Sequence, residues 1–270
     1  MHELSSRRVV QKPWGRSDIG IFNGETNGLT SRIGEIWFDN HASDVLVKYL
    51  FTSDRLSIQV HPDDRQARQM GGTRGKEECW LILEAQRGAH YGIGLKRDVS
   101  LQELERSALD GTIVDLMDWR EALAGDFIYN PAGTVHALGP GLTVLEVQQN
   151  SDITLRLFDY FSDRPLHLKE SLAVAKLGPH HHELDRHIDF TRTEVLVEGP
   201  MFGVAYCNGS LPATPAGAHD FQLVTWKNSA RVGSTIIPVG SNVRLDSPDL
   251  LELAKYDGCF LVWSAATTNS

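Results

Sequence analysis

The stretch Gly125-Asp-Phe-Ile-Tyr-Asn-Pro131-Ala-Gly133-Thr-Val-His136 decides the fold. The β-favouring run Asp126–Asn130 meets a Pro-Ala-Gly turn, and a single histidine follows three residues after the turn glycine. Such an arrangement aims the imidazole of His136 from the first residues of a strand into the mouth of a barrel. The stretch therefore predicts a β structure with a histidine at its opening.

Two segments upstream supply further side chains of the metal-ligand type. Gln59 and His61 are two residues apart, so a strand places both on one face. Glu78 faces the same interior as Trp80 and Ile82 if those two residues face inward. Two imidazoles, one carboxylate and one amide then converge, and nitrogen and oxygen donors suit Zn²⁺, Fe²⁺, Mn²⁺ or Ni²⁺. We expect Zn²⁺, one ion per chain, because two histidines and a glutamate are familiar ligands of catalytic zinc.

Each of these side chains also has an interpretation without a metal. His61 fits a histidine that bonds the backbone on a strand face, and His136 fits a turn histidine that caps a carbonyl. Glu78 and the glutamate before it fit a solvated pair. The run His180-His-His182, with His187 nearby, is a competing metal cluster. We favour a solvated loop there, because only composition points to a metal.

Composition bounds the class of protein. The chain has 270 residues and a net charge of −9, which gives no general affinity for nucleic acid or anionic membranes. Three widely separated cysteines, Cys79, Cys207 and Cys259, favour a reducing compartment over a disulfide framework. The start of the chain lacks a signal-peptide pattern, and no apolar run reaches the ~18–20 residues of a membrane helix. We expect a soluble, cytoplasmic protein with a small-molecule partner; the oligomeric state stays open.

Short strands separated by Gly, Pro, Asn and Asp dominate the chain, so we predict a mainly β fold of the jelly-roll sandwich or barrel type. The predicted strands are Val45–Phe51, Leu56–Val60, Cys79–Glu84, Ala89–Gly92, Asp126–Tyr129, Thr143–Gln148, Ile153–Phe158, Glu194–Val197, Phe202–Cys207, Phe221–Trp226, Ser234–Pro238 and Cys259–Trp263.

Helical patterns interrupt the strands in two places. Ser100–Leu109 begins with a capping-box spacing and, with Ile113–Ala124, predicts a small helical insertion. His167–Leu177 predicts a linker helix that ends at Gly178-Pro179. We therefore expect two β-rich halves: a catalytic jelly-roll domain over 1–163, with the insertion near 100–124, and a linker helix plus a second, smaller β-rich jelly-roll-like domain over 164–270.

Four motifs resemble a known family. They are Gln59-Val-His-Pro-Asp-Asp64, Lys76-Glu-Glu-Cys-Trp80, Pro131-Ala-Gly-Thr-Val-His-Ala137 and Glu146-Val-Gln-Gln-Asn-Ser-Asp-Ile-Thr-Leu-Arg-Leu-Phe-Asp-Tyr160. The spacing of the third, from Gly125 to His136, matches the second motif of the cupin superfamily. Together the motifs, spread over roughly residues 14–160, resemble the type I phosphomannose isomerases (mannose-6-phosphate isomerases) in their short bacterial form. The chain lacks the additional helical domain of the longer eukaryotic-type enzymes, and its second half resembles the family only in its β-rich character.

The resemblance implies cupin-type jelly-roll barrels and a zinc enzyme that interconverts mannose 6-phosphate and fructose 6-phosphate through an enediolate. It implies Gln59, His61, Glu78 and His136 as metal ligands. Arg156 and Lys76 map to the family's active-site arginine and lysine.

The sequence is also compatible with other roles for Arg156 and Lys76 and with other functions for the chain. Arg156 also fits a surface ion pair with a neighbouring aspartate. Lys76 fits a proton shuttle with a pKa depressed by zinc, or a cation that binds the substrate anion. The competing functions are a cupin dioxygenase with iron and a non-catalytic cupin that binds a sugar phosphate. The sequence does not identify the catalytic base.

Overall fold

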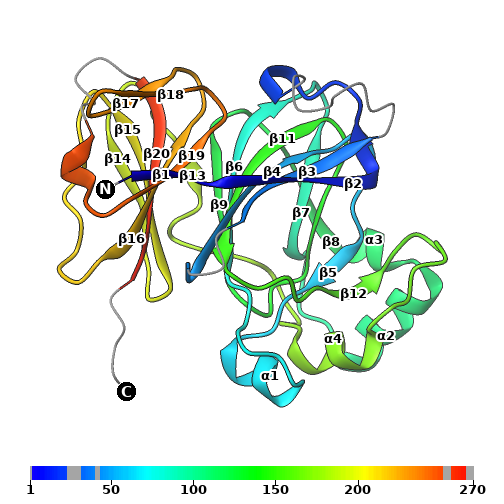
Figure 1. Cartoon of the computed structure of the whole chain (residues 1–270). Helices are drawn as coiled ribbons and strands as arrows, with labels where there is room; N and C mark the ends of the chain where they lie inside the picture. The colour runs from blue at the N-terminus through cyan, green and yellow to red at the C-terminus, as the bar shows by residue number, and fades with distance from the viewer. Residues whose placement is uncertain (1, 23–31, 40–42, 252–256, 266–270) are drawn as a thin grey trace.

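The computed structural model describes residues 2–22, 32–39, 43–251 and 257–265. Three large sheets make up most of this part of the chain (Figure 1). The seven-stranded sheet runs in the order β13 (Arg186–His187), β9 (Asp126–Asn130), β6 (Glu78–Ala85), β11 (Leu142–Gln149), β4 (Val45–Phe51), β3 (Ile33–Asp39) and β2 (Ser6–Arg16). The five-stranded sheet runs in the order β12 (Leu155–Phe158), β5 (Ile58–Val60), β10 (His136–Leu138), β7 (His90–Leu95) and β8 (Met117–Glu121).

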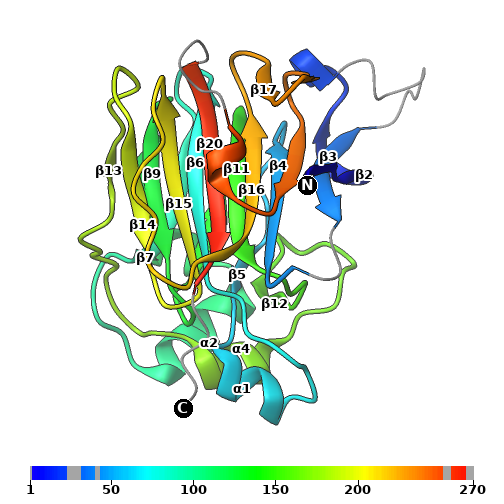
Figure 2. The ribbon, with the colours of Figure 1, turned by 60° about the vertical axis from the view of Figure 1, so that its left-hand side comes forward.

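The third sheet belongs mainly to the second half of the chain. Its order is β1 (His2–Leu4), β19 (Asn242–Leu245), β16 (His219–Thr225), β20 (Asp257–Ser264), β15 (Phe202–Asn208) and β14 (Glu194–Glu198). A small hairpin of β17 (Ala230–Val232) and β18 (Thr235–Ile237) and the 3₁₀ turn Pro248–Leu250 complete this half. Figure 2 shows the third sheet beside the seven-stranded one.

The seven-stranded sheet is buried on both faces. Cys79 and Leu81 of β6 pack with Val204 and Phe260 in the core between this sheet and the third sheet. Trp80 and Ile82 point the other way and pack toward the five-stranded sheet. Every residue of β4 is therefore buried, as a strand in a central layer requires.

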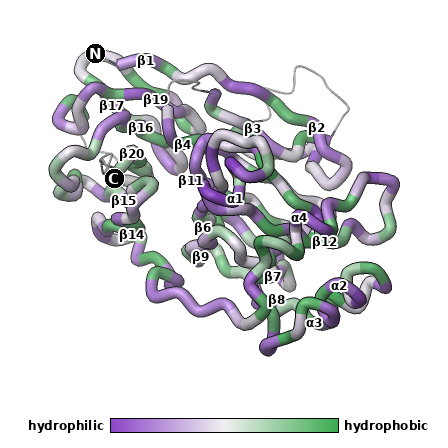
Figure 3. The backbone as a smooth tube through the Cα atoms, turned by 90° about the horizontal axis from the view of Figure 1, so that it is seen from below, coloured by the Kyte–Doolittle hydropathy of each residue, from purple (hydrophilic) through white to green (hydrophobic). Residues whose placement is uncertain are grey.

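Helices lie at one end of the first half. They are α1 (Asp64–Gln69), α2 (Leu101–Asp110), α3 (Ile113–Leu116) and α4 (Leu168–Val174). Seen from below, α4 lies beside β12, with α2 and α3 further out (Figure 3). Helix α2 carries both hydrophilic and hydrophobic residues, and buries Leu104 and Ala108. Within the described residues, none of the helices is long and apolar enough to cross a bilayer.

The predicted strands are confirmed, each with small shifts at its ends, and the mainly β fold is confirmed with them. Ser100 caps α2 by accepting a hydrogen bond from the Glu103 amide, as its spacing predicts. The predicted helix Ile113–Ala124 is wrong beyond Leu116, since β8 follows. Met117 and Trp119 pack there against Gly92 of β7, which leaves room for them by having no side chain.

The sequence did not predict every strand; those it missed include β1, β2, β3, β8, β13, β17 and β19. The first strand, β1, lies within residues 1–163 but pairs with β19, so that the N-terminal segment crosses between the halves. Ser5 extends this pairing, because its amide donates to the Asn242 carbonyl at 2.9 Å. The division of the chain near residue 163 into two domains stays a prediction.

Candidate metal centre

The centre lies between two sheets, and strand register explains why its residues meet. In the five-stranded sheet, Gln59 of β5 pairs with His136 of β10 on one side and with Arg156 of β12 on the other. In the seven-stranded sheet, Glu78 of β6 pairs with Asn130 of β9. Directly opposed residues project to the same face of a sheet, so each sheet presents one polar row to the interior.

The Pro-Ala-Gly turn places His136 at the start of β10. Gly133 has a φ of 86°, a left-handed conformation that glycine adopts without strain. The Gly133 amide donates to the His61 carbonyl at 2.8 Å, which ties the turn to the end of β5. His61 follows β5 directly, before Pro62, so both histidines enter from strand ends.

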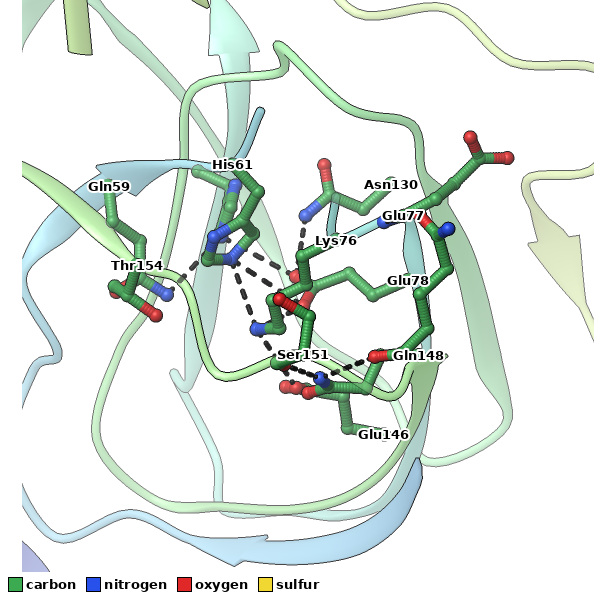
Figure 4. Close-up of polar contacts among 12 residues, drawn as sticks. Gln59, His61, Lys76, Glu77, Glu78, Asn130, Glu146, Gln148, Ser151 and Thr154 are labelled. Atoms are coloured by element: carbon green, nitrogen blue, oxygen red, sulfur yellow. Dashed lines mark hydrogen bonds and ion pairs between the residues drawn. The ribbon is translucent and has the colours of Figure 1, made fainter. Parts of the chain in front are cut away.

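Three potential ligands converge at this point. One ligand atom from each of His61, Glu78 and His136 lies within 4.8 Å of the others, and all three residues are buried. Glu78 Oε2 is 3.6 Å from His61 Nε2, and Glu78 Oε1 is 3.4 Å from His136 Nε2. Figure 4 shows His61 and Glu78 facing one another across this space.

Backbone contacts set the tautomers of both histidines. Nδ1 of His61 contacts the Ile153 carbonyl at 2.9 Å, and Nδ1 of His136 contacts the Thr134 carbonyl at 2.8 Å. A carbonyl only accepts, so each Nδ1 carries the proton, and each Nε2 keeps a lone pair directed at the centre. The donor set of two imidazole nitrogens and a carboxylate fits a divalent transition metal.

Gln59 lies beside this triad. Its amide nitrogen is 3.3 Å from His136 Nε2, and its amide oxygen lies 3.4 Å from the Ser57 hydroxyl. Ligation through the oxygen therefore needs a half-turn of the amide. The structure brings the predicted residues Gln59, His61, Glu78 and His136 to one place, and their role as metal ligands stays a prediction.

Lys76 belongs to a buried chain of alternating charges. Its Nζ is 2.6 Å from Glu78 Oε2, 3.1 Å from His61 Nε2 and 3.3 Å from Glu146 Oε1. Glu146 also pairs with Lys48 at 2.9 Å and accepts from the Trp80 indole at 3.2 Å. Lysine and glutamate thus alternate along the wall of the centre.

Burial and these neighbours shift the ionisation of the centre. Burial is the main reason that the pKa of His61 lies well below its ordinary value, with the Lys76 ammonium adding to the effect. Burial also lowers the pKa of His136, against the opposing effect of Glu78. Burial alone raises the pKa of Glu78, but the ammonium of Lys76 and other nearby cations outweigh it and lower that pKa. Neutral imidazoles and an ionised carboxylate are the forms that bind metal.

The pKa of Lys76 is raised by the protein groups around it. Burial lowers this pKa, but the carboxylates of Glu146 and Glu78 outweigh burial. The protein alone therefore keeps Lys76 as an ammonium. The depression expected from the charge of a nearby metal is a separate contribution.

A cavity of about 230 Å³ opens beside the centre. Gln59, Lys76 and His136 line it, and so does Arg156, which is half-buried with Nε donating to the Pro165 carbonyl at 3.1 Å. Among its lining residues are the cations Lys12, Lys48, Lys76, Arg156 and Arg164 and the carboxylates Glu35, Glu146 and Asp152. This basic lining suits a small anionic, hydroxyl-rich ligand.

Sequence reasoning missed several of these residues. Lys48 stands alone among apolar residues in Val45–Phe51, and a single lysine in a buried strand is a signal that could have revealed it. Arg164 is held in the cavity wall by an ion pair with the buried Asp159, with Nε to Oδ2 at 2.6 Å. Asn130 carries no such signal, since only the pairing of β9 with β6 brings it to Glu78.

The remaining candidates have other contacts. The buried His180 bonds Asp185 through Nε2 at 2.9 Å, and His182 packs on the Tyr129 ring at 4.6 Å between centroids. Among the described residues, His61, Glu78 and His136 form the one cluster with metal-ligand spacing. Asp63 caps α1, with its side chain accepting from the Gln66 amide at 2.7 Å.

Comparison with known proteins places the chain in a family. No family model matches the chain. The chain is 34% identical over 230 residues to mannose-6-phosphate isomerase ManA of Bacillus subtilis (strain 168), across 76% of this chain and 70% of that protein. The chain belongs to the mannose-6-phosphate isomerase family. It is also 37% identical over 180 residues to mannose-6-phosphate isomerase of Streptococcus mutans serotype c, across 62% of this chain but only 56% of that protein.

Solved structures of the mannose-6-phosphate isomerase family share the fold. The mannose 6-phosphate isomerase of Bacillus subtilis matches with a TM-score of 0.75 at 24% identity, over 97% of this chain and 98% of that chain. A zinc-bound mannose 6-phosphate isomerase matches with a TM-score of 0.69 at 13% identity, over 98% and 99%. These matches confirm the predicted cupin-type fold.

Proposed function

We propose that this chain is a zinc-dependent aldose–ketose isomerase that interconverts mannose 6-phosphate and fructose 6-phosphate. The observation that carries the proposal is the buried triad of His61, Glu78 and His136, with both Nε2 lone pairs directed at one point beside a basic cavity. The names of the relatives and the zinc in a structural neighbour support the same choice of substrate and metal.

We propose His61, Glu78 and His136 as zinc ligands, with Gln59 as the fourth. All four precede residue 163, which supports residues 1–163 as the catalytic unit. Bound zinc supplies Lewis acidity that polarises the sugar oxygens.

The three cysteines are buried and form no disulfide, which supports the proposed cytoplasmic location.

Lys76 and Arg156 are the proposed catalytic residues. Isomerisation moves one hydrogen between C1 and C2 of the open-chain sugar, and charge develops on the oxygens as the carbon is deprotonated. The Lys76 ammonium, held by Glu78 and Glu146, carries a proton at the inner end of the cavity. The Arg156 guanidinium, on the cavity wall, donates hydrogen bonds to oxygens of the anionic sugar.

The test is a coupled isomerase assay on the zinc-loaded protein, with mannose 6-phosphate as substrate. We expect turnover that depends on zinc, together with exchange of the C2 hydrogen with solvent. Oxygen consumption without isomerisation would instead support the iron dioxygenase. Binding of the sugar phosphate without exchange would support a non-catalytic cupin.

A histidine pair gives the matched control. His136→Ala removes one proposed ligand, so zinc content and activity should fall together. His181→Ala removes an exposed imidazole in the histidine run and should leave both unchanged. Full zinc content in the His136 variant would exclude His136 as a ligand.

A further inference from the structure

Asn130 lies next to the proposed ligand Glu78 and has no place in the function described so far. It ends β9 directly opposite Glu78 of β6, so the two side chains share the interior face. Asn130 is only 2% exposed. Its Nδ2 donates to Glu78 Oε1 at 2.7 Å, as Figure 4 shows.

The partners of the two Glu78 oxygens are different. Oε1 accepts from Asn130, and Oε2 faces the Lys76 ammonium at 2.6 Å. An ionised carboxylate only accepts hydrogen bonds, so the amide group of Asn130 must turn its nitrogen toward Glu78. Each carboxylate oxygen thus has its own partner, and the two contacts together restrain the orientation of the carboxylate beside His61 and His136.

The other end of the Asn130 amide has no hydrogen-bond partner. Its Oδ1 is buried and unpaired, whereas buried polar atoms in proteins are almost always paired. An unpaired buried acceptor destabilises the folded state, and an apolar residue in a strand interior avoids that penalty. The amide thus satisfies one buried oxygen of Glu78 but leaves its own oxygen unpaired, so its net contribution to the stability of the metal-free fold is small.

We propose that Asn130 is a positioning residue that orients Glu78 for metal binding. The proposal rests on the function proposed above, because it takes Glu78 as a metal ligand. Groups that hydrogen-bond a metal ligand commonly change metal affinity about 10–100-fold when they are removed. In this role Asn130 contributes little net stability to the metal-free protein but raises its affinity for zinc, so substitution should change zinc affinity far more than stability.

The experiment measures the zinc dissociation constant by competition with a chromophoric chelator, and the melting temperature of the metal-free protein. Asn130→Val removes the donor and the unpaired acceptor and keeps a strand-favouring side chain. We expect its dissociation constant to rise about 10–100-fold. The melting temperature of the metal-free protein should change little, because losing the donor to Glu78 and removing the unpaired oxygen have opposing effects on stability.

Two further variants separate positioning from packing. Asn130→Ala also lacks the donor but leaves a small cavity, so it should melt lower than Asn130→Val and yet show the same loss of zinc affinity. Tyr129→Phe removes the hydroxyl that bonds Glu77, the residue just before β6, and it should keep wild-type affinity. If Asn130→Val does not fold, the Ala variant carries the test.

The outcomes distinguish the two proposals. An unchanged zinc affinity in both Asn130 variants overturns the positioning role while leaving the proposed function intact. Affinity that falls only in proportion to melting temperature across the variants also overturns it. Wild-type protein that binds no zinc defeats the proposed function itself.

Discussion

The charge chain at the wall of the centre gives a quantitative prediction about stability. Lys48 and Glu146 are directly opposed on β4 and β11, with 2.9 Å between Nζ and Oε1 and less than a tenth of either side chain exposed. Glu146→Gln removes one carboxylate and leaves Lys48 and Lys76 as two buried cations. Lys48→Met has the opposite effect and leaves Glu146 and Glu78 with only Lys76.

Geometry sets the size of the effect. With an effective dielectric constant of about 20, two unit charges 2.9 Å apart attract by about 6 kcal/mol, part of which offsets the cost of burying them. Breaking a buried pair by removing one partner costs about 3–5 kcal/mol, and we expect this loss for each single variant. The double variant restores charge balance, so its cost should be lower than the sum of the two by about 1–3 kcal/mol.

Urea unfolding at pH 7 with a chelator present measures these free energies without a contribution from metal binding. The measurement is a double-mutant cycle that compares the wild type, the two single variants and the double variant. Additive losses within about 0.5 kcal/mol would mean that Lys48 and Glu146 do not interact energetically, and would refute the predicted coupling between them.

Arg156→Ala should lower kcat/KM by about 10²–10³-fold through the loss of a donor to developing charge, while zinc content stays at the wild-type level; steady-state kinetics with metal analysis checks this, and wild-type kinetics would place Arg156 outside the reaction. Burial, with the neighbouring carboxylate of Glu78, holds the pKa of the Cys79 thiol well above its usual value, so this thiol should react with a disulfide reagent only after unfolding. Because the unfolded thiol ionises near pH 8.5 and the folded one does not, the unfolded state binds fewer protons above that pH, and the free energy of unfolding should fall by up to about 1.4 kcal/mol per pH unit. Equilibrium urea unfolding at pH 8 and pH 9.5, compared between the wild type and Cys79→Ala, measures this contribution. An equal change in the free energy of unfolding with pH in the two proteins would contradict it.

Local patterns predicted the strands and the meeting of the centre's residues well. Gln59 and His61 follow from the two-residue period of a strand, and His136 follows from the turn that Gly133 makes. Glu78 faces inward with Trp80, as parity requires. These features depend on neighbours in sequence, which a single chain displays.

Contacts between strands that are distant in sequence could not be predicted from these local patterns. The pairing of Lys48 with Glu146, and of Asn130 with Glu78, depends on which strands are adjacent and on their register. The error at Ile113–Ala124 has the same origin, because Gly92 on another strand makes the space into which Met117 and Trp119 pack. The Lys76 pKa likewise depends on Glu146, which lies 70 positions along the chain.

The first strand bears on how the molecule is made. A ribosome releases β1 long before its partner β19, because His2 of β1 pairs with Leu245 of β19, far along the chain. Pairing between such distant segments is slow to form. During synthesis β1 therefore stays without its partner strand until β19 has been made, and the third sheet can gain this edge strand only then.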